Sequence, residues 1–152
     1  MVDILSREKR SALMASVRTV GTKPEMRVRR VAYSCGLRYR IAPRGVRGRP
    51  DLSFSGARIA VFVHGCFWHG HEGCRKAKLP TTNSEFWAAK IQSNQRRDIE
   101  IQSHLIADGW RHIVIWECET KNYATIVERL APVITHYRGS EFLSRAIEAS
   151  IK

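Results

Sequence analysis

The sequence lacks any long hydrophobic run. Its apolar stretches fall well short of the roughly 20 consecutive residues that a membrane-spanning helix needs. The N-terminal segment MVDILSREKR also lacks the apolar core of a secretory signal peptide. These absences argue against a membrane protein and a secreted one, so we expect no membrane partner and a cytoplasmic location.

Cysteine is scarce as well. The 152 residues include only Cys35, Cys66, Cys74 and Cys118, which is few for the disulfide framework of a small secreted protein. Cys66 and Cys74 lie close to histidines in the sequence. This pattern favours metal ligation in a reducing compartment over disulfide bonds.

Acidic residues are the third shortage. Lys and Arg number 26 against 14 Asp and Glu, which gives a net charge of +12. The excess is concentrated in residues 1–50, where thirteen basic residues stand against three acidic ones. A solvated basic face and an affinity for acidic membranes are possible readings. The preference for Arg, whose planar fork matches phosphate oxygens, favours nucleic acid as the partner.

Length and hydrophobic pattern predict one α/β domain over residues 1–152. A chain of this length suits a single core, and hydrophobic residues make up 43% of it. Periodicity and turn residues predict a small mixed sheet flanked by helices. The expected helices cover 6–17, 24–36, 84–109, 121–136 and 140–150, and the expected strands cover 37–41, 51–56, 57–63 and 110–118. The strand over 57–63 is continuously apolar, so we expect it to be central.

Caps and buried faces follow from the same patterns. Ser6 and Ser84 are expected helix N-caps, Pro24 suits a first helical turn, and Gly36 and Gly109 are placed to end helices. In the second helix the predicted apolar face is Met26, Val28, Val31, Ala32 and Cys35. In the long helix the predicted buried stripe is Phe86, Ile91, Ile99, Leu105 and Ile106, and the predicted polar face is Lys90, Asn94 and Arg97.

The stretch VFVHGCFWHGHEGC, residues 61–74, runs from a strand into a cluster of metal-binding side chains. Cys66, His71 and Cys74 are soft ligands at short spacing, which suits tetrahedral zinc. Cys118 is the expected fourth ligand, and His69 competes with His71 as the nitrogen donor. A closed four-ligand site would be structural. The alternative is a pair of ordinary buried cysteines near surface histidines, and Cys35 reads as a small core residue.

Four segments in order resemble the very short patch repair endonucleases. They are GRPDLSF, VFVHGCFWHGH, SEFWAAKIQSNQRRD and GWRHIVIWECE. These enzymes nick DNA at mismatches and have the PD-(D/E)xK restriction-endonuclease fold. The resemblance covers about residues 6–120, with HGCFWH as its most specific part, and the final 30 residues or so carry little of it.

The resemblance implies two metals and a set of catalytic residues. Asp51 is the implied magnesium ligand, His69 the base or water-positioning group, and Glu25 and His64 the supporting catalytic positions. The implied zinc ligands are Cys66, His71, Cys74 and Cys118. The best-known member has Thr at the position of Val63, so here only the main-chain carbonyl of Val63 would bind magnesium. One extra residue also separates His71 from Cys74, and the acid-x-Lys pair of the wider superfamily is missing.

The implied DNA contacts come from three segments. Phe67, Trp68 and Trp87 match the aromatic wedge that the family inserts beside the mismatch, Met14 in the arm over residues 1–22 enters from the other groove, and Lys90 and Asn94 contact the mispair. Residues 137–152 are expected to form a C-terminal helix. Core packing is the alternative reading for Trp68, Trp87 and Met14. For His69 the alternatives are a zinc ligand and a residue that supports a metal ligand from behind.

The resemblance also implies a substrate and partners. We expect a monomer that nicks one strand 5′ to the thymine of T:G pairs, which arise when 5-methylcytosine deaminates. A cytosine methyltransferase would be its genetic companion, and mismatch-repair proteins are possible partners. The alternatives are a relative with another mismatch or site specificity, acting in restriction or defence, and a non-catalytic zinc-stabilised DNA-binding module.

Overall fold

Strand β2 (Ile59–His64) occupies the centre of the sheet. In the computed structural model, which describes residues 4–151, β2 lies between two neighbours. It is antiparallel to β1 (Leu52–Phe54) and parallel to β3 (Arg111–Trp116). The predicted hairpin, central strand and mixed sheet are therefore confirmed. Residues 1–3 of the predicted arm and residue 152 of the predicted C-terminal helix lie outside the described residues.

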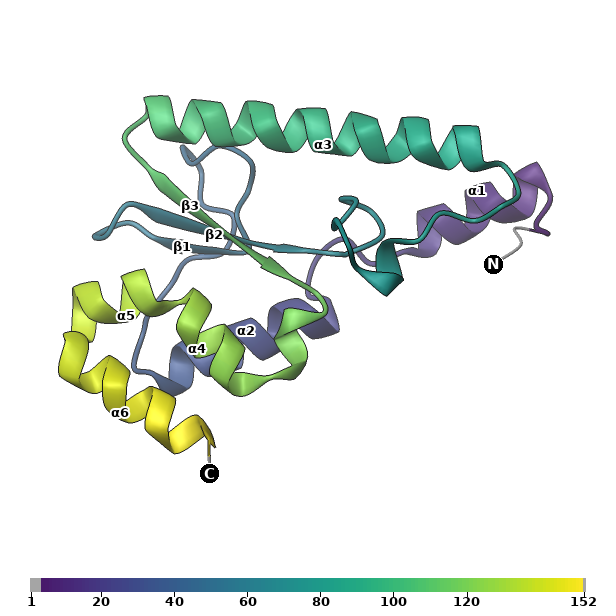
Figure 1. Cartoon of the computed structure of the whole chain (residues 1–152). Helices are drawn as coiled ribbons and strands as arrows, with labels where there is room; N and C mark the ends of the chain where they lie inside the picture. Colours follow the sequence, from purple (N-terminus) through teal and green to yellow (C-terminus); the bar gives the residue numbers. More distant parts are fainter. Residues whose placement is uncertain (1–3, 152) are drawn as a thin grey trace.

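Helices cover both faces of this sheet (Figure 1). The long helix α3 (Ser84–Ala107) lies on one face. The opposite face carries α2 (Lys23–Ser34), α4 (Tyr123–Arg129), α5 (Ala131–Arg138) and α6 (Ser140–Ile151). Helix α1 (Arg7–Ser16) lies toward the end of the sheet where the loop over 65–83 emerges. The predicted α/β architecture, a small mixed sheet flanked by helices, is confirmed for the described part of the chain.

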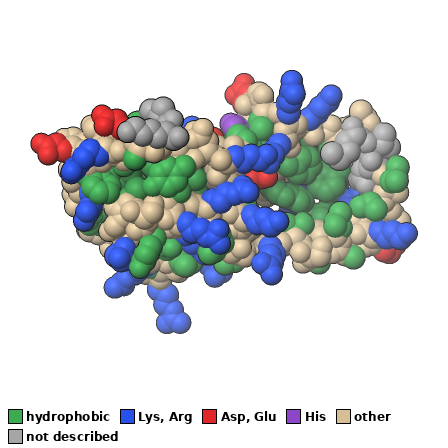
Figure 2. Space-filling view, turned by 90° about the horizontal axis from the view of Figure 1, so that it is seen from below, with side chains coloured by type: hydrophobic (Ala, Val, Ile, Leu, Met, Phe, Trp, Pro, Cys, Tyr) green, Lys and Arg blue, Asp and Glu red, His purple; other side chains and the backbone are tan. Residues whose placement is uncertain are grey.

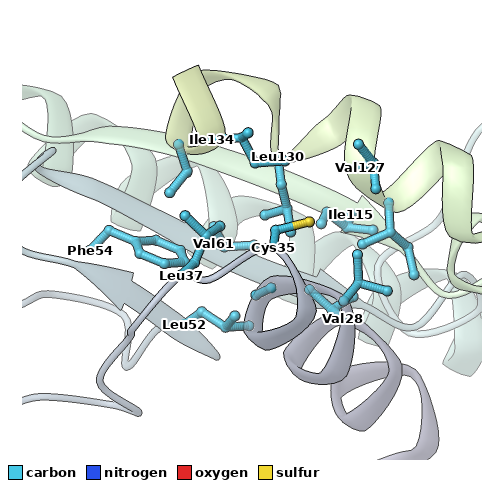
Figure 3. Close-up of a cluster of buried hydrophobic side chains, with 14 of the residues drawn as sticks. Val28, Cys35, Leu37, Leu52, Phe54, Val61, Ile115, Val127, Leu130 and Ile134 are labelled. Carbon is cyan, nitrogen blue, oxygen red and sulfur yellow. The ribbon is translucent and has the colours of Figure 1, made fainter. Parts of the chain in front are cut away.

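The alternation of side chains along β2 explains its unbroken apolar run. Ile59 and Val61 belong to the larger core, which α2, α4 and α5 complete on one face (Figure 3). Ala60 and Phe62 instead pack beneath α3 with Leu105. Successive residues of a strand point to opposite faces, so a strand covered on both sides must be apolar throughout.

Several local signals have the predicted effect. Ser6 caps α1 by accepting a hydrogen bond from the Lys9 N–H, and Pro24 lies in the first turn of α2. Gly36 follows α2 with φ of +73°, a conformation that disfavours other residues. Cys35 is 2% exposed and belongs to the larger core, as predicted.

The predicted strand over 37–41 is wrong. Its backbone makes a single bridge, between Arg40 and Ser53, because β1 is only three residues long and Ala42 turns the chain away with φ of +41°. The predicted helix over 121–136 is also wrong in extent. It divides into α4 and α5 at Leu130, where Pro132 lies in the first turn of α5 and has no N–H to continue the earlier helix.

The predicted faces of α2 and α3 need correction. Met26 is 38% exposed, and in α3 Phe86, Ile99 and Ile106 are exposed. The buried positions of α3 are Trp87, Ile91, Asn94 and Leu105. Trp87, Ile91 and Asn94 are spaced by four and three residues, and Leu105 follows about three turns later, so all four lie on one face of the helix. The sheet beneath them has three strands. Ser84 is the first residue of α3 and not its cap, which is Asn83.

The described helices include none that is both long and apolar enough to cross a membrane.

Candidate active site and metal-binding cluster

A cleft of about 980 Å³ opens where α1, α2, the loop before β1, the end of β2 and α3 meet. Most of the predicted catalytic and DNA-contacting residues line it, namely Met14, Glu25, Asp51, Val63, His64, Trp68, His69, Lys90 and Asn94. They come from segments far apart in the sequence. Their common position is the first structural support for a shared site.

Asp51 is the buried carboxylate of the cleft. Its Oδ2 accepts a hydrogen bond of 2.6 Å from the Val63 N–H. The pKa of Asp51 is raised to about 6, chiefly by burial and also by the charge of Glu25, while the Val63 N–H and the charge of Arg29 oppose the rise. A carboxylate in this setting gains stability from a cation placed beside it.

Glu25 stabilises the start of α2 through hydrogen bonds of its carboxylate. Thr22 is the N-cap, and its hydroxyl donates to Glu25 Oε1 at 2.9 Å. Glu25 Oε2 accepts from the Gly21 N–H at 2.8 Å and from Arg29 at 3.2 Å. This is a capping box, and it holds Glu25 3% exposed beside the cleft. The T-x-x-E spacing of Thr22 and Glu25 is a signal for it that the sequence analysis missed.

The two cleft histidines stack on each other. The rings of His64 and His69 lie 3.9 Å apart, centroid to centroid, at 11°. His64 continues the even-numbered positions of β2 that face α3. Burial lowers the pKa of His64 to about 4, and the neighbouring His69 adds to this effect. His64 is therefore neutral at neutral pH.

Asp98 of α3 is the residue that the sequence analysis did not identify. His69 Nδ1 lies 2.5 Å from Asp98 Oδ2, and His64 Nδ1 lies 4.0 Å from the same oxygen. An ionised carboxylate only accepts, so the shared proton belongs on His69 Nδ1 and leaves its Nε2 as an acceptor. The spacing of Lys90, Asn94 and Asp98, four residues each, was a signal for one cleft-facing helix stripe.

Behind the histidines lies a second cluster. The ligand atoms of Cys66, His71, Cys74 and Cys118 all lie within 4.8 Å of one another. Cys118 Sγ is 3.5 Å from His71 Nδ1, which is about the separation of sulfur and nitrogen around a tetrahedral zinc ion. Of the two candidate nitrogen donors, the structure places His71 in this cluster and His69 beside Asp98.

The thiols of this cluster differ in environment. Burial raises the pKa of Cys66 to about 12, whereas the Lys76 N–H lowers that of Cys74. A buried thiolate needs a cation to offset its desolvation. Three thiols and one imidazole are the donor set of closed zinc sites, so these residues fit that ion.

The aromatic residues form one cluster that reaches the cleft through Trp68, whereas Phe67 and Trp87 are not among the residues that line it. Phe67, Trp68 and Trp87 meet edge to face, with ring centroids 5.3 to 6.0 Å apart. Trp87 is buried, at 8% exposed, and Phe67 and Trp68 are partly exposed. Trp87 therefore packs against the other two rings from a more buried position.

The loop that carries Phe67 and Trp68 rests on α3, the helix that carries Trp87. Asn94 Nδ2 donates to the Trp68 carbonyl at 2.7 Å, and Gln95 Nε2 donates to the carbonyl of His69 at 3.3 Å. A side chain at Gly70, where φ is +62°, would come within 2.5 Å of Gln95. Asn94 is itself buried and braces the loop, while Lys90 remains exposed at the rim.

Comparisons with known proteins identify the family. The family model described as DNA mismatch endonuclease Vsr matches residues 2–76. The type II nicking enzyme V.XorIIP of Xanthomonas oryzae pv. oryzae is 42% identical over 134 residues, which are 88% of this chain and 98% of that protein. The chain belongs to the Vsr family of DNA mismatch endonucleases. Among the other Vsr relatives, the type II nicking enzyme V.NmeAIP of Neisseria meningitidis is 43% identical over 130 residues, covering 86% of this chain and 92% of its own.

A further Vsr relative carries the family's name. The DNA mismatch endonuclease Vsr of Escherichia coli is 38% identical over 118 residues, which are 78% of this chain and 75% of that protein. Membership of the Vsr family confirms the predicted resemblance and makes this chain a DNA endonuclease. It leaves the roles of individual residues to the geometry above.

Proposed function

We propose that this Vsr-family protein is a strand-specific endonuclease that nicks DNA 5′ to the thymine of T:G mismatches produced by deamination of 5-methylcytosine. The observation that carries the proposal is the cleft, in a chain of this family, where Asp51, His64 and His69 lie together. We also propose that residues 1–152 form one domain of the restriction-endonuclease type.

Two metals complete the proposed enzyme. Asp51 and the main-chain carbonyl of Val63 would hold magnesium, because oxygen donors suit this ion and the buried Asp51 carboxylate needs a cation. Bound magnesium would supply charge neutralisation at the phosphate and at the departing oxygen. Zinc would be structural, held by Cys66, His71, Cys74 and Cys118, and would fix the loop over 65–83 to the end of β3.

His69 is the proposed general base. With its Nδ1–H held by Asp98, Nε2 accepts the proton of the attacking water. His64 keeps the His69 ring in its plane through stacking and, being neutral, adds no charge that would compete for the Asp98 carboxylate. Glu25 acts on Asp51 through its charge and through the start of α2.

DNA binding is proposed to use the rim of the cleft. Phe67 and Trp68, supported by Trp87, would enter beside the mispair, where unstacking costs less than in a matched duplex. Met14 lines the same cleft as Trp68 and lies on α1, which has no buried residue among Arg7–Ser16. Lys90 would contact the mispair directly. Asn94 would act in addition by holding Trp68.

The proposed biological setting follows from the substrate. A cytosine methyltransferase would produce the 5-methylcytosine whose deamination creates T:G pairs. Mismatch-repair proteins would be partners of the enzyme, which would work as a cytoplasmic monomer. These partners are proposals that rest on the resemblance alone.

The test is a panel of duplexes that differ in one base pair. Purified protein with magnesium should nick the thymine strand of a T:G duplex and leave the matched T:A and C:G duplexes intact. Asp51→Ala should bind the T:G duplex and fail to nick it. Nicking by Asp51→Ala at the wild-type rate would show that the active site lies elsewhere, and absence of nicking by wild type on every duplex would favour a non-catalytic DNA-binding module.

A second candidate function has one specific observation in its favour. The two relatives of highest coverage quoted above bear the name type II nicking enzyme. The same chemistry could therefore serve another mismatch or another flanking sequence. In the panel, preferential nicking of a mispair other than T:G would select this candidate.

A further inference from the structure

Trp116, the last residue of β3, lies between the two sites. Its ring is parallel to that of His71, at 4.2 Å between centroids and 1° between planes. The same indole meets His64 edge to face, at 5.5 Å and 75°. His64 in turn stacks on His69 at 3.9 Å. Four rings, His71, Trp116, His64 and His69, thus form one continuous series from the cysteine cluster to the cleft.

The backbone holds Trp116 firmly in this place. Its N–H donates to Glu119 Oε2 at 2.9 Å, and Glu119 is itself paired with Arg129. Trp116 is the register partner of His64 across the parallel pair β2–β3. The next residue, Glu117, donates its N–H to the His64 carbonyl at 2.8 Å. The main chain of Trp116 is therefore fixed to the sheet, and the stacked His71 ring opposes rotation of the indole about its side-chain bonds.

We propose that Trp116 is a positioning residue that couples the zinc site to the catalytic histidines. This inference rests on the functions proposed above for the two sites. A zinc ion held by His71 would fix the plane of that imidazole, and the parallel indole packs against it. The indole in turn limits rotation of His64, whose stacked face keeps His69 turned toward Asp98. Correct orientation of a general base within hydrogen-bond reach is a requirement of its function.

The coupling must act in both directions. If the zinc-bound His71 restrains His64 through Trp116, then His64 restrains His71 through the same ring. Removal of the His64 ring or of the Trp116 ring should therefore weaken zinc binding. A residue that only fills the core would lower stability without this reciprocal effect. The two readings therefore differ in what they predict for zinc release.

The experiment compares three variants with wild type. Trp116→Leu removes the ring, Trp116→Phe keeps an aromatic face, and Trp110→Leu is the matched control at the opposite end of β3, where the indole packs in the small core beneath α3. The measurements are kcat and KM for nicking of the T:G duplex, and the rate of zinc release to a chromogenic chelator. Thermal unfolding checks each fold.

We expect Trp116→Leu to lower kcat about tenfold, the scale of one lost aromatic pair, with KM within about twofold of wild type. Zinc release should accelerate by a similar factor. Trp116→Phe should recover most of both losses. Trp110→Leu should lower the melting temperature while kcat and zinc release stay at wild-type values. Equal effects of Trp110→Leu and Trp116→Leu would overturn the proposal, as would wild-type kcat and zinc release in Trp116→Leu.

A double-mutant cycle keeps this test separate from the proposed nicking activity. In the protein that retains Trp116, His64→Ala should accelerate zinc release. In the Trp116→Leu variant, the same substitution should have little further effect on zinc release. Additive effects of the two substitutions would overturn the coupling. Because zinc release needs no substrate, the cycle decides the role of Trp116 even if wild type nicks no duplex.

Discussion

Asp51 combines burial with a need for charge. Burial raises its pKa from 3.8 to about 6, so the ionised form that binds a cation is the form that the folded protein disfavours. The Val63 N–H offsets part of this cost. An active-site group that destabilises the fold is a frequent consequence of function.

This balance predicts the effect of Asp51→Asn. Because the folded-state pKa is raised, the stabilising contribution of protonated Asp51 is present below about pH 4 and lost as the pH rises through about 6. Without added magnesium, Asp51→Asn should therefore be more stable than wild type at about pH 7.5, by about 1–3 kcal/mol. At about pH 4 the difference should shrink toward zero.

Thermal melting of both proteins over this pH range is the measurement. Magnesium should raise the melting temperature of wild type and leave Asp51→Asn unchanged. A constant difference between the two proteins across the whole range would mean that Asp51 does not titrate as described.

His69 and Asp98 should behave as one unit. His69→Ala should lower the nicking rate by about 10²–10⁴-fold, the range for a lost general base. Asp98→Ala should also lower it, because His69 loses the acceptor that sets its tautomer. Single-turnover rates of both single variants and the double variant are the measurement. The double variant should be no slower than His69→Ala alone. If the two rate losses multiply in the double variant, His69 and Asp98 act independently.

At the scale of single residues, a site whose members are close in the sequence could be recognised from the sequence alone. Cys66, His71 and Cys74 lie within nine positions of one another, and a short loop brings such neighbours together with any fold. Asp98 lies 29 positions from His69. Its place depends on the rotation of α3 about its axis, which the exposed Ile99 and Ile106 made ambiguous in the sequence.

At the scale of elements, prediction worked where burial on both sides dictated composition, as in β2. Prediction failed where the neighbouring strand was too short to pair with a segment, and where a single residue ended one helix and began another. The segment 37–41 has strand-like composition, but β1 offers it only one bridging partner. Pro132 was visible in the sequence, yet a helix with Pro in its first turn can begin directly after another, and only the structure showed that α5 does so.

The loop over 65–83 gives a prediction at the same scale. Cys118→Ala should reduce zinc content and lower the melting temperature, because the loop loses its attachment to the end of β3. Cys35→Ala is the matched control, since it also removes a buried thiol but lies in the larger core. It should lower stability and retain one zinc per chain. Metal analysis of the untreated proteins decides, and wild type without zinc would refute the assignment of all four ligands.

At the scale of the whole molecule, the surface charge is the dominant feature. Figure 2 shows Lys and Arg side chains spread over the face that carries α2 and α6, with few acidic groups among them. This distribution suits non-specific attraction to a polyanion, which falls as salt rises. Not every Arg contributes, because Arg29 is buried and paired with Glu25, whereas Arg27 and Arg30 are exposed on the same helix.

The basic surface should therefore determine the affinity for DNA, and the aromatic cluster should determine the preference for a mismatch. Replacing Arg27 and Arg30 by Ala should weaken binding to T:G and T:A duplexes about equally and reduce the salt slope by up to about 2, because phosphate contacts do not read the base pair. Trp68→Ala should instead reduce the preference for T:G more than the overall affinity, because the ring senses how easily the step unstacks.

Binding isotherms for both duplexes at two salt concentrations separate these effects. Trp87→Ala is the control for the cluster, since this buried ring supports Trp68 from beneath and its loss should lower thermal stability as well as preference. Trp68 is partly exposed, so its removal should leave the melting temperature close to that of wild type. Equal loss of affinity for both duplexes in Trp68→Ala, together with a lowered melting temperature, would make Trp68 a packing residue and move recognition of the mispair to Lys90 and Met14.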